Sequence, residues 1–187
     1  QRSPVGFESE LDLRAAIERI LGEAGRRADE SSPYCDARLP DGSRVNVVLP
    51  PLAVDGPVLT IRKFRTRWPS VAELAESGSW EPEAAALLTS AVRERKSILV
   101  SGGTGSGKTT ALAAVASLAE PTDRVIVIED TAELALSLPH VVRLEARPAN
   151  VEGRGAVTIR DLVRNALRMR PDRLIVGEVR GVEVVDL

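Results

Sequence analysis

Residues 97–110 read SILVSGGTGSGKTT, in which an apolar run leads into a glycine-rich loop and then into a helical pattern. The stretch 102–109 matches the pattern G-x-x-x-x-G-K-[ST], and its flanks are the strand-like run and the helix that this pattern requires. Glycines let the backbone curl so that its N–H groups face phosphate oxygens, and the positive end of the helix dipole adds to the attraction. The stretch therefore predicts a phosphate-binding loop, with a merely flexible glycine loop as the alternative.

The residue types in this loop suit a nucleotide with a divalent cation. Lys108 can bridge the terminal phosphates, and the hydroxyl of Thr109 can bind Mg²⁺. The residues expected to contact the nucleotide are Gly102, Gly103, Thr104, Gly105, Ser106, Gly107, Lys108, Thr109 and Thr110.

The sequence around the loop alternates helical segments with continuous apolar runs, which favours buried parallel strands. Strands are expected at 97–102, 124–130, 140–146 and 173–179, and helices at 82–96, 108–119 and 158–170. Thr158 with Asp161 three residues later is a helix-capping signal. This half of the chain thus predicts an α/β fold, a P-loop core with helices on both faces of a parallel sheet.

The first part of the chain has a different rhythm. Apolar residues at helical spacing predict a helix over 7–24, and three short strand-like runs follow, the first two joined by Asp41 and Gly42, a dipeptide suited to a tight hairpin turn. Trp68 and Pro69 then break the pattern. We expect a small α+β N-terminal domain over 1–64, a linker over 65–78 and the P-loop domain over 79–187.

Carboxylates follow two of the expected strands in the P-loop domain. Glu129 and Asp130 end one strand, Glu133 comes one turn later, and Glu178 ends another, where Gly177 stands at the position expected for an Asp. Ligands of open α/β sheets bind at the carboxyl ends of strands, so both sets are expected at the edge that carries the phosphate loop. The alternative is that these acids cap helices or lie in solvent.

Composition excludes several classes of protein. Net charge is −2, with 43% hydrophobic and 28% charged residues, so no general basic field favours nucleic acid. No apolar run approaches the roughly 20 residues that span a bilayer. The start of the chain lacks the apolar stretch of a secretion signal, and Cys35 has no partner for an internal disulfide. We expect a reducing, cytoplasmic setting.

Several long motifs together resemble the type II/type IV secretion ATPase family. They are VLTIRKF, GGTGSGKTT, VIVIEDTAELAL and HVVRLEARPANVEGRGAVTIRDLVRNALRMRPDRLIVGEVRG. The resemblance covers residues 41–186. Within the family, the sequence is most similar to the branch that assembles tight-adherence pili.

This resemblance implies an ATPase that works on the cytoplasmic side of a membrane machine, peripheral to the inner face of the cell membrane. Its subunits form a homo-oligomer, a hexamer in the full-length protein, and contact membrane platform proteins of the pilus or secretion system. Each subunit has a small N-terminal domain hinged to a RecA-like C-terminal domain, with ATP and Mg²⁺ bound between them. No nucleic acid is expected as a partner.

The resemblance also assigns roles to the acids and to the loop lysine. Glu178 matches the acid of a variant Walker B motif, acting at Mg²⁺ and water, while Thr109 supplies the second metal contact. Glu129 is the first acid of the family's acidic box and a candidate for activating the water, with Glu133 as support. Lys108, Glu129 and Glu178 are therefore expected to be catalytic, and the sequence leaves open which acid is the general base.

Arginines complete the expected site, since a planar cation meets the charge on a transferring phosphoryl group. By resemblance, Arg62 in TIRKF is the first candidate for a catalytic phosphate contact, and Arg44 is the second. Arg65 and Arg67 are more typical of a solvated linker. A stripe on the helix 158–170, namely Arg160, Arg164 and Arg168, is either a solvated face or a subunit contact.

The family carries a histidine segment downstream of the Walker B region, and the sequence ends at Leu187 without one. His140 is expected to be structural. We therefore expect the RecA-like core to be C-terminally incomplete, with low intrinsic activity. Two other functions stay open: a nucleotide-binding assembly module without turnover, and a nucleic-acid motor, which the acidic net charge and scarce aromatic residues disfavour.

Overall fold

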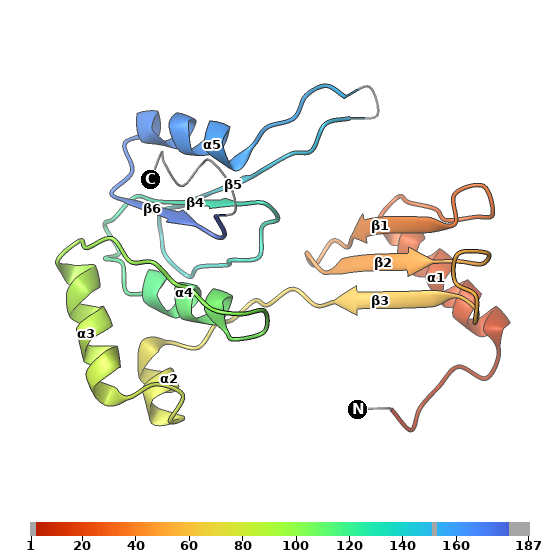
Figure 1. The fold of residues 1–187 in the computed structure, drawn as a ribbon, viewed down its shortest axis with the longest axis horizontal. Helices are drawn as coiled ribbons and strands as arrows, with labels where there is room; N and C mark the ends of the chain where they lie inside the picture. Colours follow the sequence, from red (N-terminus) through yellow and green to blue (C-terminus); the bar gives the residue numbers. More distant parts are fainter. Residues whose placement is uncertain (1–2, 151–152, 180–187) are drawn as a thin grey trace. The chain divides into compact units, whose positions relative to one another are not determined.

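The computed structural model describes residues 3–150 and 153–179, and the chain divides into two compact units (Figure 1). Unit 1 comprises residues 1–64 and unit 2 comprises residues 65–187. Two segments lie outside the described residues, 151–152 and 180–187. The first precedes the helix expected at 158–170, and the second includes the last two residues of the GEVRG motif.

Unit 1 packs one helix on one face of a small sheet. Helix α1 (Glu10–Glu23) begins at Ser9, whose side chain accepts a hydrogen bond from the Asp12 N–H at 3.2 Å. Ile17 and Leu21 lie on the apolar stripe of α1 and are almost fully buried in the core of the unit. The expected N-terminal helix is thus confirmed, and its apolar face is what binds it to the sheet.

The sheet of unit 1 is antiparallel, in the order β1 (Tyr34–Arg38), β2 (Arg44–Val48), β3 (Val58–Arg62). Val45 and Val47 point into the core, and their neighbours along β2 point away from it, as a half-buried strand requires. Gly42 in the β1–β2 turn has φ 88°, and a Cβ there would lie 3.0 Å from the Phe64 ring. The predicted hairpin is confirmed.

Unit 2 is built on a parallel sheet in the order β5 (Val141–Glu145), β4 (Val125–Glu129), β6 (Arg173–Val176). Every residue of β4 is buried. Helix α4 (Lys108–Ala116) packs on the face that carries Val125 and Val127, and helix α5 (Ile159–Ala166) covers the opposite face. Figure 1 shows the sheet between these two helices, so the predicted α/β layering is confirmed.

Helix α5 shows the expected capping. The side chain of Thr158 accepts from the Asp161 N–H at 3.2 Å, and Asp161 in turn accepts from the Thr158 N–H at 3.0 Å. A single 3₁₀ turn, η1 (Leu167–Met169), ends the helix, and Arg170 follows with φ 53°. None of the helices in the described part of the chain is long and apolar enough to cross a membrane.

Two further helices complete unit 2. Helix α2 (Val71–Glu76) lies within residues 65–78, the segment for which the sequence predicts a linker, and helix α3 (Pro82–Arg93) follows it. A capping box between Ser70 and Glu73 starts α2, and Val71 is buried against residues of α3 and α4. The expected linker therefore contains a helix that belongs to the core of unit 2.

The strand expected at 97–102 is not present in the structure. These residues form no ladder, and Leu99 is 89% exposed. Both edges of β4 are taken by β5 and β6, and neither of these two strands pairs with the segment before the phosphate loop, so no ladder holds it as a strand. The apolar run correctly marks the start of the loop but not its pairing.

A buried acid joins the elements at the amino ends of the strands. Asp123 is 4% exposed and accepts hydrogen bonds from Arg173 Nε at 2.8 Å and from the Glu120 N–H at 3.3 Å. Arg95 also pairs with it at 3.3 Å, and the Arg173 guanidinium donates to the Val92 carbonyl at 2.8 Å. This network ties the end of α3 to the starts of β4 and β6.

Candidate functional site

Two glycines of the phosphate loop, Gly107 by its backbone conformation and Gly102 by a close contact, disfavour other residues at their positions. Gly107 is the N-cap of α4 with φ 89°, a left-handed conformation that glycine adopts without strain. A Cβ on Gly102 would lie 2.7 Å from the Ser106 hydroxyl, closer than a real contact allows. The loop can therefore keep this tight curl only with glycine at these two positions.

The loop and the helix after it present donors suited to an anion. The first N–H groups of a helix have no intrahelical acceptor and carry the positive end of its dipole, and Gly107 supplies no side chain to cap those of α4. Lys108 Nζ donates to the Gly103 carbonyl at 2.6 Å, which holds the ammonium group over the loop. Residues 101–107 are exposed, so the donors are accessible. This geometry fits the phosphates of a nucleotide.

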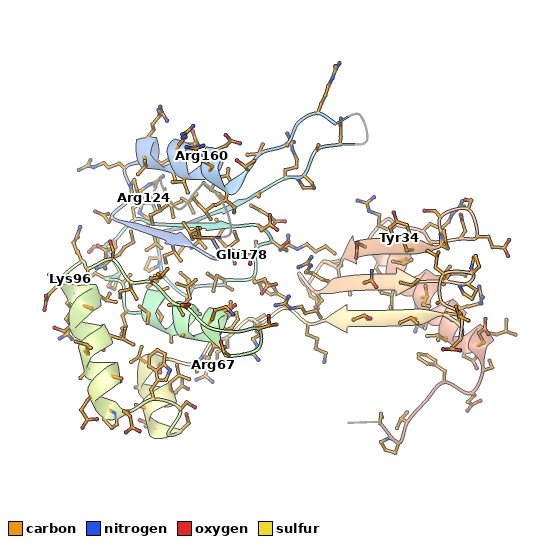
Figure 2. All side chains as sticks on the ribbon, viewed as in Figure 1. Tyr34, Arg67, Lys96, Arg124, Arg160 and Glu178 are labelled. Atoms are coloured by element: carbon orange, nitrogen blue, oxygen red, sulfur yellow. The ribbon has the colours of Figure 1, made fainter. Side chains whose placement is uncertain are left out.

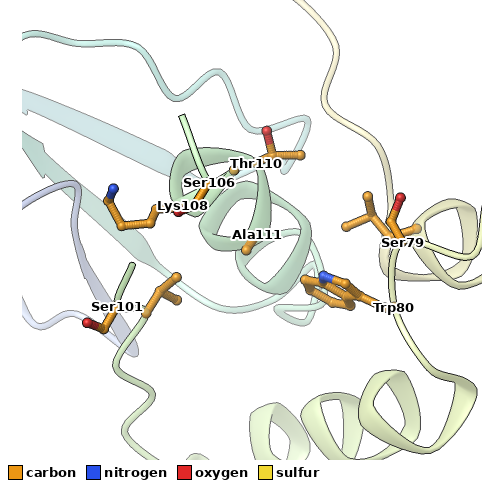
Figure 3. A pocket seen from close by; sticks show the side chains of 10 residues that line it. Ser79, Trp80, Ser101, Ser106, Lys108, Thr110 and Ala111 are labelled. Atoms are coloured by element: carbon orange, nitrogen blue, oxygen red, sulfur yellow. The ribbon is translucent and has the colours of Figure 1, made fainter. Parts of the chain in front are cut away.

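A cavity of about 340 Å³ adjoins the loop (Figure 3). Loop and helix residues line part of it, including Ser106, Lys108 and Thr110, and the segment between α2 and α3 lines another part, including Ser79 and Trp80. The sequence motif indicates the first set. It gives no signal for the second, because Trp80 reaches the loop only through the packing of α2 and α3 on α4.

Glu129, the last residue of β4, is the buried acid at the carboxyl edge of the sheet. It is 4% exposed, and its Oε1 accepts hydrogen bonds from the N–H groups of Glu133 at 2.9 Å and Leu134 at 3.0 Å. Its Oε2 is buried without a hydrogen-bond partner. Burial raises the pKa of Glu129 above its usual value, although the two N–H groups act in the opposite direction. One carboxylate oxygen of Glu129 is thus hydrogen-bonded to two backbone N–H groups, and the other is buried without a hydrogen-bond partner.

The position after β6, which Gly177 occupies, has no room for the side chain of an Asp. The Gly177 N–H donates to the Ile128 carbonyl at 2.8 Å, and the register that pairs Ile128 with Val176 puts this glycine beside Glu129. A Cβ on Gly177 would lie 2.9 Å from Glu129 Cγ. The missing side chain makes room for the buried acid of the neighbouring strand, and the acid of this motif moves one residue on, to Glu178.

Glu178 is exposed and lies two residues after the end of β6 (Figure 2). Helix α4 begins on the side of unit 2 where β4 and β6 end, so the loop and both acids share one side of the sheet (Figure 1). Among these acids Asp130 is exposed, and Glu133 is half-buried with its N–H bonded to Glu129. The structure thus gathers the predicted acids at one edge.

The donor set suits Mg²⁺ bound together with a nucleotide. No group of three or more His, Cys, Asp or Glu side chains that could hold a metal occurs among residues 3–150 and 153–179. Mg²⁺ bound with phosphates commonly takes only one or two protein ligands and completes its shell with phosphate oxygens and water. Thr109 and Glu178 supply oxygen donors of this kind, so they are compatible with such a site.

The arginines expected at the site lie in unit 1. Arg44 in β2 is the cross-strand partner of Arg62 in β3, and Arg38 in β1 is the partner of Arg44 on the other side. All three side chains are exposed on the face of the sheet opposite α1. The three arginines therefore form one row across the strands of this sheet.

The remaining candidates have structural partners in unit 2. The guanidinium of Arg65 lies 5.3 Å from the centre of the Trp68 ring, and Arg67 forms an ion pair with Glu73 of α2. His140 lies 2.5 Å from an Arg124 nitrogen, and its carbonyl accepts from the Val125 N–H. The contacts of His140 agree with the structural role expected for it. The contacts of Arg65 and Arg67 are with nearby residues of the chain, as expected for a solvated linker.

Comparison with known proteins places the chain in a family. The family described as Type II/IV secretion system protein matches residues 1–187. A putative conjugal transfer protein of Mycobacterium tuberculosis is 48% identical over 193 aligned positions, which cover 100% of this chain and 55% of that protein. Protein VirB11 of Agrobacterium fabrum is 34% identical, over 95% of this chain and 58% of its own length.

A solved structure supports the fold. The X-ray structure of the Legionella pneumophila ATPase DotB matches with a TM-score of 0.59 and 22% identity, over 98% of this chain and 51% of that one. At this identity the match concerns the fold alone. The chain spans about half the length of the curated relatives described above, 55% and 58%.

Proposed function

This chain belongs to the type II/IV secretion system protein family, and we propose that it is the ATP-binding and hydrolysing part of a motor subunit. The motor would power pilus assembly or protein secretion through a membrane complex. The observation that carries this proposal is the phosphate loop before α4, on the side of the sheet where the buried acid Glu129 ends β4.

The phosphates would be bound by the N–H groups that begin α4 and by the ammonium group of Lys108, which would leave the Gly103 carbonyl for a phosphate oxygen. Thr109 and Glu178 would hold Mg²⁺, which supplies charge neutralisation on the phosphates when bound. Thr110 and the loop glycines 102, 103, 105 and 107, with Thr104 and Ser106, would complete the phosphate contacts.

Glu129 is the better candidate of the two acids for the general base. A general base works best when its pKa lies near the working pH, and burial shifts the pKa of Glu129 upward. Its Oε1 is held by two N–H groups, which leaves Oε2 as the oxygen that would take a proton from the attacking water. Glu178, which is exposed, then serves the metal.

Arg62 would stabilise the charge on the transferring phosphoryl group, and Arg44 would add a second phosphate contact. Their support is the family resemblance of the TIRKF motif together with the place of both arginines in one row across β2 and β3, where planar guanidinium groups suit a phosphate. Arg62→Ala should therefore lower turnover more than it lowers the affinity for ADP.

The relatives' names guide the proposal for the surroundings of the motor. Relatives named as conjugal transfer and VirB11 proteins agree with a role in transfer or secretion. By the family resemblance, the subunits would form a homo-oligomer, a hexamer in the full-length form, that contacts secretion or pilus platform proteins at the cytoplasmic face of the cell membrane. Nucleic acid is not a proposed partner, because net charge is −2.

The test is Mg–ATP binding and hydrolysis by the chain, compared with Lys108→Ala, with the oligomer size recorded in the same samples. Turnover above that of the variant is the expected result. Binding without turnover would favour an assembly module that uses the nucleotide to fix its geometry. Salt-sensitive binding of single-stranded DNA would instead point to a nucleic-acid motor.

A further inference from the structure

The cavity beside the phosphate loop has two chemically different ends. Figure 3 shows Lys108 and Ser101 at one end, Trp80 and Ser79 at the other, and Ala111 between them. Leu74 from α2 adds a second apolar side chain to the lining. A ligand that fills this cavity would meet a cation at one end and a flat aromatic ring with aliphatic carbon at the other.

The size and the floor of the cavity suit a nucleoside. Its volume of about 340 Å³ lies at the lower end of the range of about 300 to 1,000 Å³ that small-molecule sites occupy. Ala111 and Gly107, which have little or no side chain, line the stretch between the two ends. Space for a ligand beside α4 therefore comes from the small residues of the helix itself.

Trp80 is held in place by the core and not by the loop. It is half-buried and packs with Val71, Ala85 and Ala114, and its backbone N–H donates to the Leu74 carbonyl at 3.1 Å. The rest of its surface lines the cavity. Packing against these residues limits the movement of the ring, so less rotamer freedom is lost when a ligand stacks on it.

We infer that the Trp80 end of the cavity binds the nucleobase of the nucleotide whose phosphates the loop holds. Aromatic side chains stack on any base, because every base has a π-face. One molecule could reach both ends, since Lys108 and Trp80 line the same cavity. This inference rests on the proposed binding of ATP and names the residue that would recognise its base.

Isothermal titration of the chain with Mg–ATP and with Mg–tripolyphosphate separates the two ends, because tripolyphosphate has no base. Trp80→Leu keeps apolar volume and removes the ring, and Trp80→Phe restores a ring as the matched control. We expect Trp80→Leu to weaken ATP binding about tenfold and to leave tripolyphosphate binding unchanged, with Trp80→Phe close to wild type. Equal weakening of both ligands by Trp80→Leu, or no weakening of ATP binding, would overturn the inference.

A second measurement leaves Trp80 in place. Trp68→Phe makes Trp80 the single tryptophan of the chain. Saturating ATP should change its fluorescence, and saturating tripolyphosphate should not; an emission unaffected by ATP overturns the inference. Lys108→Ala should lose both ligands, which tests the loop separately. If the unchanged chain binds neither ligand, the proposed function fails as well; if it binds both equally, only the base site fails.

Discussion

Two buried carboxylates stand at opposite ends of the central strand β4, and their surroundings differ. Asp123, two residues before the strand, and Glu129, its last residue, are each 4% exposed. Both oxygens of Asp123 are paired, with Arg173, Arg95 and the Glu120 N–H. Glu129 has two N–H donors on one oxygen and none on the other.

The difference teaches which edge of the sheet serves stability and which serves chemistry. The hydrogen bond from Arg173 is the main reason why the pKa of Asp123 is lowered, whereas burial raises the pKa of Glu129. An unpaired buried polar atom costs free energy, so a fold keeps one where it has a use. The amino edge is thus a structural clamp, and the carboxyl edge holds a poised acid.

The largest expected effect comes from removing the charge at the carboxyl edge. Glu129→Gln keeps the shape of the side chain but cannot take a proton, so ATP turnover should fall about a thousandfold while ATP affinity stays the same. Its free energy of unfolding should stay within about 1 kcal/mol of wild type. Turnover in a stopped-flow or radiolabel assay, alongside titration of ATP, checks both expectations.

The amino edge should give the opposite result. Asp123→Asn leaves Arg173 without its charged partner in a buried setting, so the free energy of unfolding should fall by about 3 kcal/mol. Turnover per folded molecule should not change. Urea unfolding followed by circular dichroism, with the assay run well below the unfolding midpoint, checks this, and a catalytic defect in the folded variant would break the comparison.

Gly177 lies against Glu129 at the carboxyl edge, so a side chain added there should displace this acid. In Gly177→Ala the added Cβ would lie 2.9 Å from Glu129 Cγ, so unfolding free energy should fall by about 2 kcal/mol and turnover should drop as Glu129 shifts. The double variant Gly177→Ala with Glu129→Ala removes the clash, and the two stability losses should then not add. Additive losses would mean that the two residues do not compete for space.

The smallest effect is the pH dependence of stability, which should have opposite signs at the two edges. Glu129 keeps protons to higher pH when folded, so its contribution to stability falls as pH rises above its usual pKa of 4.5. Asp123 stabilises the fold above its usual pKa of 3.8, and this is lost as pH falls through its lowered folded pKa. Unfolding curves of wild type, Glu129→Gln and Asp123→Asn across pH 3–8 should show each slope vanish in its own variant.

Local signals in the sequence predicted the parts of the structure that depend on neighbours along the chain. The loop motif, the capping pair Thr158 and Asp161, and the turn at Gly42 each act over a few residues, and all lie where expected. Helix α2 was not predicted, although Ser70 and Glu73 form the S-x-x-E signature that starts it.

Features that depend on long-range pairing could not be predicted. The segment 97–102 has the composition of a strand, but none of the strands β4, β5 and β6 pairs with it. The contact between Gly177 and Glu129 follows from the register of two strands far apart in the chain, and the pair of Asp123 and Arg173 joins residues 50 positions apart. Trp80 likewise reaches the loop only through helix packing.

The most direct test of the account is single-turnover hydrolysis of Mg–ATP by three proteins, the unchanged chain, Glu129→Gln and Asp123→Asn, each normalised to the amount of folded protein with bound ATP. The account predicts hydrolysis by the unchanged chain and by Asp123→Asn at similar rates, and bound but uncleaved ATP in Glu129→Gln. Hydrolysis by Glu129→Gln at the rate of the unchanged chain would contradict it.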